Sequence, residues 1–142
     1  MSRSRLSFPA DGRVVREVRA RVRRFASSLG AGSSVCDNLA LVVDELVNNA
    51  IEHGAVYRTG NQELAVCIEP ADERIAIEFF DPEMPDDQVE ELAESLSAAT
   101  NGMPSLDSER GRGLFLLTVY LDGLRAERVD KGGLRLVGYI DR

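Results

Sequence analysis

Apolar side chains recur every three or four residues in two early stretches of the chain. In the first stretch the apolar positions are Val15, Val18, Val22, Phe25 and Leu29. The second begins near Ser33 or Ser34, either of which suits a helix N-cap, and continues to Gly54. Because this spacing places apolar side chains on one face of a helix, the pattern predicts two amphipathic helices.

Apolar and polar residues alternate in other parts of the chain, which is typical of strands with one buried face. Pro9 closes the earliest of these segments, and a Lys131-Gly132-Gly133 turn joins the last two into a hairpin. The pattern predicts five strands, over 4–8, 63–69, 74–80, 124–129 and 134–140.

Residues 81–110 differ from the rest, because Pro82 and Pro85 interrupt them and residues 98–110 have no clear period. A short acidic helix is expected over 89–96 and an apolar one over 114–121. Long irregular segments in compact domains often form functional lids, so we expect a lid over about 82–110. The order of elements predicts a single α+β domain over 1–142, a two-layer sandwich with helices on one face of a mixed, mostly antiparallel sheet.

Composition narrows the class of protein. The formal net charge is −7, which disfavours direct binding to nucleic acid. No stretch approaches the ~20 apolar residues that span a bilayer, and the N-terminal residues lack the apolar run of a signal peptide. Cys36 and Cys67 are isolated in apolar settings, as buried thiols of a reducing compartment would be. We therefore expect a cytoplasmic protein without a membrane partner.

An early segment that includes the first helix carries a concentration of basic residues in an otherwise acidic chain. These are Arg13, Arg16, Arg19, Arg21, Arg23 and Arg24. Such residues most often form a solvated helix face, and the alternative is a docking surface for an acidic partner.

Glu45, Asn49 and His53 lie four residues apart, so they form one polar stripe on the second helix. A solvated face would explain this spacing, but two adjacent asparagines within an apolar helix need a further reason. The segment 45–54, ELVNNAIEHG, resembles the N box of the GHKL (Bergerat-fold) ATPases. The variant E-x-x-x-N-A-x-x-H-G is most similar to the anti-sigma factor serine kinases of the RsbW and SpoIIAB type. The similarity extends over nearly the whole chain.

The resemblance assigns roles to these side chains. It implies that Asn49 binds Mg²⁺ through its side-chain oxygen, that His53 belongs to the ATP-binding N box, and that Glu45 is the general base for a serine hydroxyl. Mg²⁺ prefers oxygen ligands and takes few of them from protein. A carboxylate one helical turn from the metal ligand can reach the γ-phosphate region.

Two further segments resemble the remaining boxes of these ATPases. Asp81 matches the aspartate that accepts a hydrogen bond from the adenine amino group, although the usual D-x-G-x-G pattern is here DPEMP. If position 83 requires a left-handed backbone, Glu83 costs about 1–2 kcal/mol there, and ATP affinity falls roughly tenfold or more. The segment 109–117, ERGRGLFLL, matches the phosphate-binding G2 box. The resemblance implies ATP contacts from Arg110, Gly111, Arg112 and Gly113.

Taken together, the resemblance implies a homodimeric anti-sigma factor that binds ATP and Mg²⁺. Such a protein sequesters a sigma factor and phosphorylates a STAS-type anti-anti-sigma partner on serine. The missing glycines at positions 83 and 85 keep an alternative open, a sequestering module without kinase turnover. A detached histidine-kinase ATPase domain is a third interpretation, disfavoured because the chain offers no phosphoacceptor histidine besides His53.

Overall fold

The computed structural model describes residues 3–100 and 109–142, and of residues 100 and 109–112 only the backbone. A short 3₁₀ turn, η1 (Gly12–Val14), precedes the first helix. The helices are α1 (Val15–Ser28), α2 (Ser33–Gly54), α3 (Asp86–Thr100) and α4 (Glu109–Tyr120). The strands are β1 (Ser4–Phe8), β2 (Leu64–Ala71), β3 (Arg74–Asp81), β4 (Asp122–Arg128) and β5 (Leu134–Asp141).

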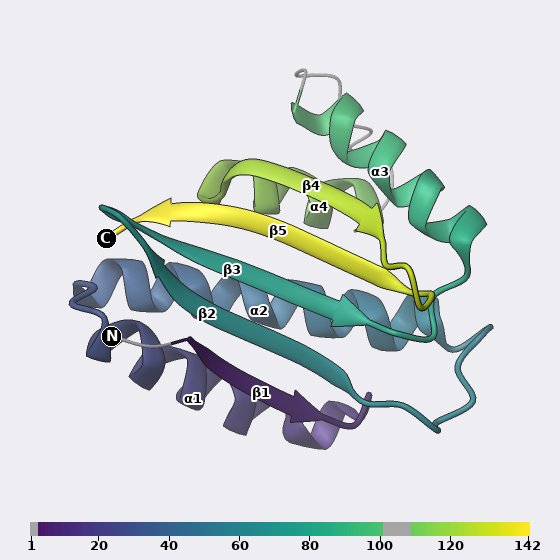
Figure 1. Cartoon of the computed structure of the whole chain (residues 1–142), viewed down its shortest axis with the longest axis horizontal. Helices are drawn as coiled ribbons and strands as arrows, with labels where there is room; N and C mark the ends of the chain where they lie inside the picture. The colour runs from purple at the N-terminus through teal and green to yellow at the C-terminus, as the bar shows by residue number, and fades with distance from the viewer. Residues whose placement is uncertain (1–2, 101–108) are drawn as a thin grey trace.

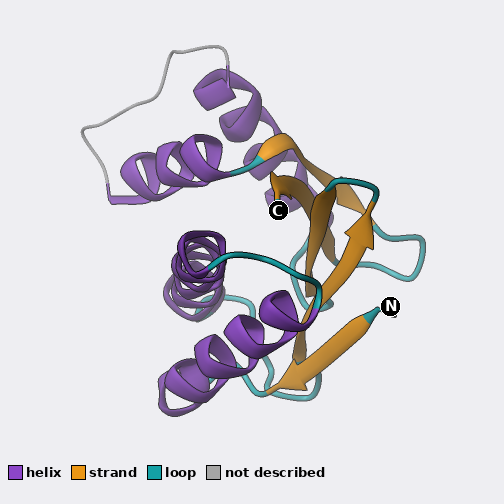
Figure 2. Cartoon of the chain, turned by 90° about the vertical axis from the view of Figure 1, so that its left-hand side faces the viewer, coloured by secondary structure: helices purple, strands orange, loops and turns teal. Residues whose placement is uncertain are grey.

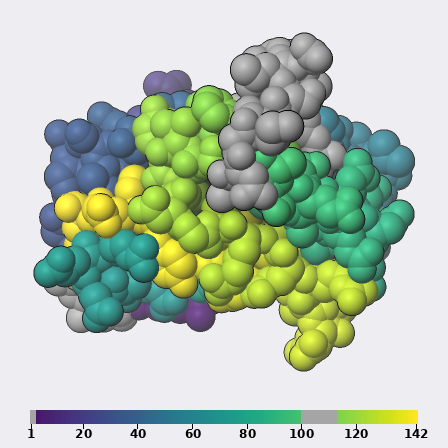
Figure 3. All heavy atoms as spheres, turned by 90° about the horizontal axis from the view of Figure 1, so that it is seen from above, coloured from purple at the N-terminus to yellow at the C-terminus, as the bar shows by residue number. Residues whose placement is uncertain are grey.

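The strands form one sheet in the order β1-β2-β3-β5-β4, and every neighbouring pair is antiparallel. The helices lie on one side of this sheet (Figures 1 and 2). Viewed from above, α3 (green) lies beside the lime-coloured segment that contains α4 and β4 (Figure 3). The predicted fold class, an α+β sandwich with its helices on one face of the sheet, is confirmed.

The core lies between the helices and the inner face of the sheet. Strand β3 is central, and its inward residues Ile75, Ile77 and Phe79 are almost completely buried. The buried face of α2 packs above them through side chains that include Leu39 and Val43. The end of β3 lies beside the C-terminal half of α2 (Figure 1), and one Arg58 nitrogen donates to both Asp81 and the Ala50 carbonyl of the predicted N box.

Helix boundaries differ from the sequence prediction at three points. Gly32 rather than a serine is the N-cap of α2, and no side chain caps that helix. Helix α3 is longer than residues 89–96, because Asp86 and Asp87 favour its N-terminal turn and Ala99 extends its buried stripe. Helix α4 already begins at Glu109, so the predicted loop shortens to residues 101–108, which lie outside the described part.

Cys36 and Cys67 are free and buried, as predicted. None of the helices that the structure describes is long and apolar enough to cross a bilayer.

Candidate nucleotide site

Glu45 and Asn49 face each other along one turn of α2. The Asn49 Nδ2 donates a hydrogen bond to the Glu45 Oε1 at 3.2 Å. An amide that donates through its nitrogen presents its oxygen on the other side. Asn49 therefore contacts the carboxylate through its amide nitrogen, and the predicted Mg²⁺ contact of its Oδ1 stays a prediction.

Helix α4 meets this pair at Gly113. A Cβ atom at this position would overlap the carboxylate of Glu45. Any side chain at position 113 would displace the Glu45 carboxylate from this place, which gives one glycine of the predicted G2 box a packing role. The structure thus brings Gly113 next to Glu45 and Asn49, which are neighbours on α2 but lie far from Gly113 in the sequence.

The first turn of α4 contains the rest of the predicted G2 box. The first four N–H groups of an α-helix have no acceptor within the helix, and Arg110, Gly111 and Arg112 occupy that turn because α4 begins at Glu109. A helix N-terminus of this kind suits phosphate oxygens. The side chains of Arg110 and Arg112 lie outside the described part of the chain, so their predicted contacts stay predictions.

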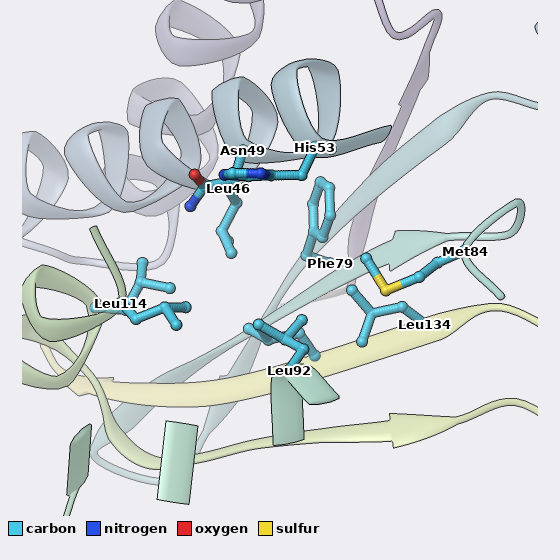
Figure 4. A pocket seen from close by; sticks show the side chains of 11 residues that line it. Leu46, Asn49, His53, Phe79, Met84, Leu92, Leu114 and Leu134 are labelled. Atoms are coloured by element: carbon cyan, nitrogen blue, oxygen red, sulfur yellow. The ribbon is translucent and has the colours of Figure 1, made fainter. Parts of the chain in front are cut away.

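A small cavity lies between α2, the sheet, α3 and α4 (Figure 4). Asn49 and His53 lie side by side on its α2 wall, and the other walls are apolar. Residues around it include Phe79, Met84, Leu92, Leu114 and Leu134. Its volume of about 30 Å³ has room for one or two water molecules. The cavity has the apolar walls that a base requires but, in this conformation, not the volume.

Asp81 lies at the end of β3 and is completely buried. Tyr57 donates its hydroxyl to the Asp81 Oδ2 at 2.6 Å, and Arg58 donates to both carboxylate oxygens, at 3.0 and 2.8 Å. The backbone N–H of Glu83 donates to Oδ1 at 3.2 Å. A carboxylate has about four acceptor positions, so protein donors fill those of Asp81.

The same contacts alter the ionisation of the donors. Burial, together with the hydrogen bond to Asp81, raises the pKa of Tyr57 well above its usual value. Hydrogen bonding to Asp81 raises the pKa of Arg58 against the opposing effect of burial. Tyr57 is therefore neutral and Arg58 charged throughout the physiological range.

Glu83 stands where the D-x-G-x-G pattern has glycine, and it adopts no left-handed backbone. Among the described non-glycine residues, only Asp72 has a positive φ. The backbone penalty considered for Glu83 therefore does not arise. Its carboxylate accepts hydrogen bonds from the Thr59 N–H at 2.6 Å, the Thr59 hydroxyl at 2.7 Å and the Gln62 N–H at 3.2 Å. Glu83 thus ties the turn after β3 to the loop before β2.

A glycine of the β4–β5 turn supports the end of β3 from the other side. Gly133 has a φ of +98°, and a Cβ there would lie 2.6 Å from the Pro82 Cα and 2.7 Å from the Asp81 carbonyl oxygen. The backbone of Gly133 therefore packs directly against the backbone of Asp81 and Pro82 and fixes the position of the turn after β3.

Sequence reasoning missed four residues of this region: Tyr57, Arg58, Glu83 as a hydrogen-bond acceptor, and Gly133 as a packing position. Tyr57 and Arg58 lie in a stretch without periodicity, directly after the predicted N box. The sequence feature that could have indicated them is an arginine next to a tyrosine in a loop only three residues after the N box.

These observations allow a test of whether the residues suit Mg²⁺ and ATP. The phosphate end fits, because Asn49 carries an amide oxygen, Glu45 carries a carboxylate, and the first N–H groups of α4 have no acceptor within the helix. The base end does not fit as it is folded here, because Asp81 has its full set of donors and the cavity is too small.

Known proteins that are similar to this chain share its α+β fold. The family model of the histidine kinase-like ATPase domain matches residues 8–137. The anti-sigma F factor of Clostridium acetobutylicum is 26% identical over 132 residues, which cover 93% of this chain and 88% of that protein.

Two solved structures share the fold. The SiaB-SiaC complex from Pseudomonas aeruginosa contains a chain that superposes with a TM-score of 0.77 at 16% identity, covering 96% of this chain and 88% of that one. The structure of the RsbU and RsbW domains of Rv1364c from Mycobacterium tuberculosis has a TM-score of 0.69 at 19% identity, covering 99% of this chain. This chain spans only 32% of that longer protein.

The resemblance predicted from the N box is therefore confirmed, and the family implies a nucleotide-binding domain. Because the matching model covers most of its length, the chain belongs to the histidine kinase-like ATPase domain family.

Proposed function

We propose that this protein is an anti-sigma factor with serine kinase activity. It sequesters a sigma factor and phosphorylates an anti-anti-sigma protein of the STAS type. The similarity to an anti-sigma F factor supports the class of partner. The observation that carries the kinase activity is the Glu45 carboxylate, held by Asn49 and packed against Gly113.

Each residue of this group has a defined task. Asn49 binds Mg²⁺ through its amide oxygen and orients Glu45 through its amide nitrogen. Glu45 accepts the proton of the incoming serine hydroxyl. Gly113 lets the first turn of α4, whose N–H groups have no acceptor within the helix, approach that carboxylate. When bound, ATP would supply the phosphoryl group and Mg²⁺ would neutralise the negative charge of the phosphates.

Phosphorylation of the partner then changes its binding by local electrostatics. A phosphoserine adds about −1.5 to −2 charges at neutral pH, and a new charge at the contact surface separates this protein from the anti-anti-sigma protein. We place the reaction in a homodimer of single-domain chains in the cytoplasm.

A second candidate is a module that sequesters its partner without turnover. The observation that favours it is the complete set of protein donors around Asp81. Both candidates share the partner, so phosphotransfer separates them.

The test uses labelled ATP, Mg²⁺ and the STAS-type protein encoded nearest to this one. For a kinase, Glu45→Gln retains ADP binding but lowers phosphotransfer by about 10²–10⁴-fold, the usual contribution of a general base. Glu52→Gln is the matched control, because Glu52 is an exposed glutamate of the same helix, and it leaves transfer unchanged. No transfer by the unmodified protein, with partner binding intact, would instead establish the sequestering module.

A further inference from the structure

Each carboxylate oxygen of Asp81 already accepts two hydrogen bonds from the protein, which leaves no acceptor position for an adenine base. Oδ2 accepts from the Tyr57 hydroxyl and one Arg58 nitrogen, and Oδ1 accepts from the other Arg58 nitrogen and the Glu83 N–H. An adenine amino group would add one more donor to the same carboxylate. One of the present donors must leave before that group can bind.

Arg58 is held in place by more than its ion pair. Its backbone N–H donates to the Gly54 carbonyl at 2.8 Å, and its Nη2 donates to the Ala50 carbonyl at 3.0 Å. The guanidinium group also covers Gly54, where a Cβ atom would overlap it. Its side chain is only 10% exposed. These contacts place a cation at the C-terminal end of α2, where the helix dipole favours it.

The loop that carries Arg58, residues 55–63, is fastened at its other end by Glu83. The Thr59 and Gln62 hydrogen bonds join this loop to the turn after β3. The Arg58 Nη2 that donates to Asp81 also donates to the Ala50 carbonyl, so departure from Asp81 also breaks the side-chain contact with α2. Residues 55–63 carry Arg58 and are themselves held by the bonds to Glu83.

We infer that Arg58 controls access of an adenine nucleotide to this domain, because its ion pair with Asp81 and adenine recognition by Asp81 exclude each other. This inference rests on the nucleotide site of the proposed function. Arg58 supplies two of the four donors, so its departure opens an acceptor position on each oxygen. The conformation with residues 55–63 folded against Glu83 is the one that does not bind the base.

We call the conformation with residues 55–63 folded against Glu83 the closed conformation. Because the Arg58–Asp81 pair and adenine binding exclude each other, ADP affinity should rise when the closed conformation is destabilised. A site that is competent only part of the time binds with an affinity reduced by that fraction. Calorimetry with ADP and Mg²⁺ should therefore show at least about tenfold tighter binding to Arg58→Ala than to the unmodified protein. Glu83→Gln should give a smaller gain, because it removes one acceptor oxygen that holds the loop and leaves the Arg58–Asp81 pair in place. The matched control is Arg24→Ala, an exposed arginine of α1, which should bind ADP as the unmodified protein does.

Inosine diphosphate tests whether Asp81 carries the effect, because its base has a carbonyl in place of the amino group. The gain in Arg58→Ala should be confined to ADP. An equal gain for both nucleotides would place the effect elsewhere and overturn the inference.

Hydrogen exchange supplies a readout that needs no catalysis. The N–H groups of Tyr57, Arg58, Thr59 and Gln62 all donate in the closed conformation. Saturating ADP should speed their exchange in the unmodified protein, although a bound ligand usually slows it. Unchanged or slower exchange of these amides with ADP bound overturns the inference, as does the absence of ADP binding in both Arg58→Ala and Glu83→Gln. A missing phosphotransfer reaction would overturn the kinase activity alone, since binding and exchange are measured without a partner.

Discussion

Gly113 has no side chain, and the carboxylate of Glu45 occupies the space that a Cβ atom would fill. The contact matters because a general base is useful only where its carboxylate oxygen can reach the proton it accepts. Asn49 holds that carboxylate from one side and the backbone of α4 confines it from the other.

Gly113→Ala should separate this positioning from the stability of the fold. The added methyl group displaces Glu45, while alanine is favoured over glycine within a helix by about 1 kcal/mol. The free energy of unfolding should therefore change by no more than about 1 kcal/mol, while phosphotransfer falls by about 10²–10⁴-fold. Denaturant unfolding and a transfer assay measure the two effects. Gly12→Ala is the control, because no atom lies within 4 Å of its added Cβ; a Gly113 variant as active as this control would remove the positioning role.

Among the individual residues of the candidate nucleotide site, the sequence predicted the pair on α2 but not the donors around Asp81. The four-residue spacing placed Glu45 and Asn49 on one face of α2, and their hydrogen bond follows from that spacing. The donors around Asp81 were not predictable, because Tyr57 and Arg58 lie 24 and 23 positions away and belong to a loop without a period. Their contacts depend on how α2 crosses β3, which local pattern does not encode.

Among the elements, the β4–β5 turn is distinguished by two consecutive glycines with positive φ, +95° at Gly132 and +98° at Gly133. Only Gly133 packs against the chain that leaves β3; an added Cβ at Gly132 meets no atom within 4 Å. The two positions therefore share one backbone requirement and differ in packing.

This difference makes a matched pair of substitutions. Gly132→Ala should cost about 1–2 kcal/mol of unfolding free energy, the usual penalty for a side chain in left-handed backbone. Gly133→Ala should cost more, because its methyl group also meets the Pro82 backbone, which cannot yield as a flexible side chain would. Urea denaturation of both variants checks the order, and equal losses would show that the turn does not support the end of β3.

The loop over residues 55–63 should respond to acid through Glu83. The Thr59 hydroxyl and N–H, followed by the Gln62 N–H, lower the pKa of Glu83 below its usual 4.5 in the folded protein. A carboxyl group with a lowered pKa stabilises the fold fully above its unfolded pKa and loses that contribution as the pH falls through the folded pKa. The loop contacts should therefore weaken only below about pH 4.5.

Amide chemical shifts of Thr59 and Gln62, followed by NMR from pH 7 downward, measure this release. Both signals should move together in the unmodified protein, with a midpoint below the usual range of a glutamate. In Glu83→Gln the shared transition should disappear, since the amide does not titrate. A midpoint at or above the usual value would contradict the hydrogen-bonded carboxylate.

Periodicity predicted the elements better than their ends. The apolar spacing identified α1, α2 and all five strands, because one buried face per element is enough to produce the pattern. Helix α3 was predicted too short, since Ala99 and the acidic first turn contribute little hydrophobic signal. The start of α4 was missed because glycines at 111 and 113 are unfavourable within helices, and the requirement for Gly113 comes from a neighbouring helix.

In the whole molecule, the Arg58–Asp81 pair joins the helical layer to the sheet. Arg58 bonds the Ala50 carbonyl of α2 and the carboxylate at the end of β3 through one guanidinium group. Exposed ion pairs contribute about 0–1 kcal/mol, whereas loss of one partner from a buried pair leaves an uncompensated charge. The molecule contains both kinds, since Arg23 and Asp37 form an exposed pair at 3.3 Å between α1 and α2.

Arg58→Ala should lower the free energy of unfolding by roughly 3–5 kcal/mol, because Asp81 stays buried without its cation. A domain of this size is stable by about 5–15 kcal/mol, so the variant should still fold and be available for nucleotide binding. Arg23→Ala should cost no more than about 1 kcal/mol. The double change Arg58→Met with Asp81→Leu should recover part of the loss, because it removes both charges at similar volume. Recovery is incomplete, since the Tyr57 hydroxyl and the Glu83 N–H then lose their acceptor. Guanidinium unfolding of the four proteins measures these differences, and equal losses for Arg58→Ala and Arg23→Ala would show that the buried pair does not couple the two layers.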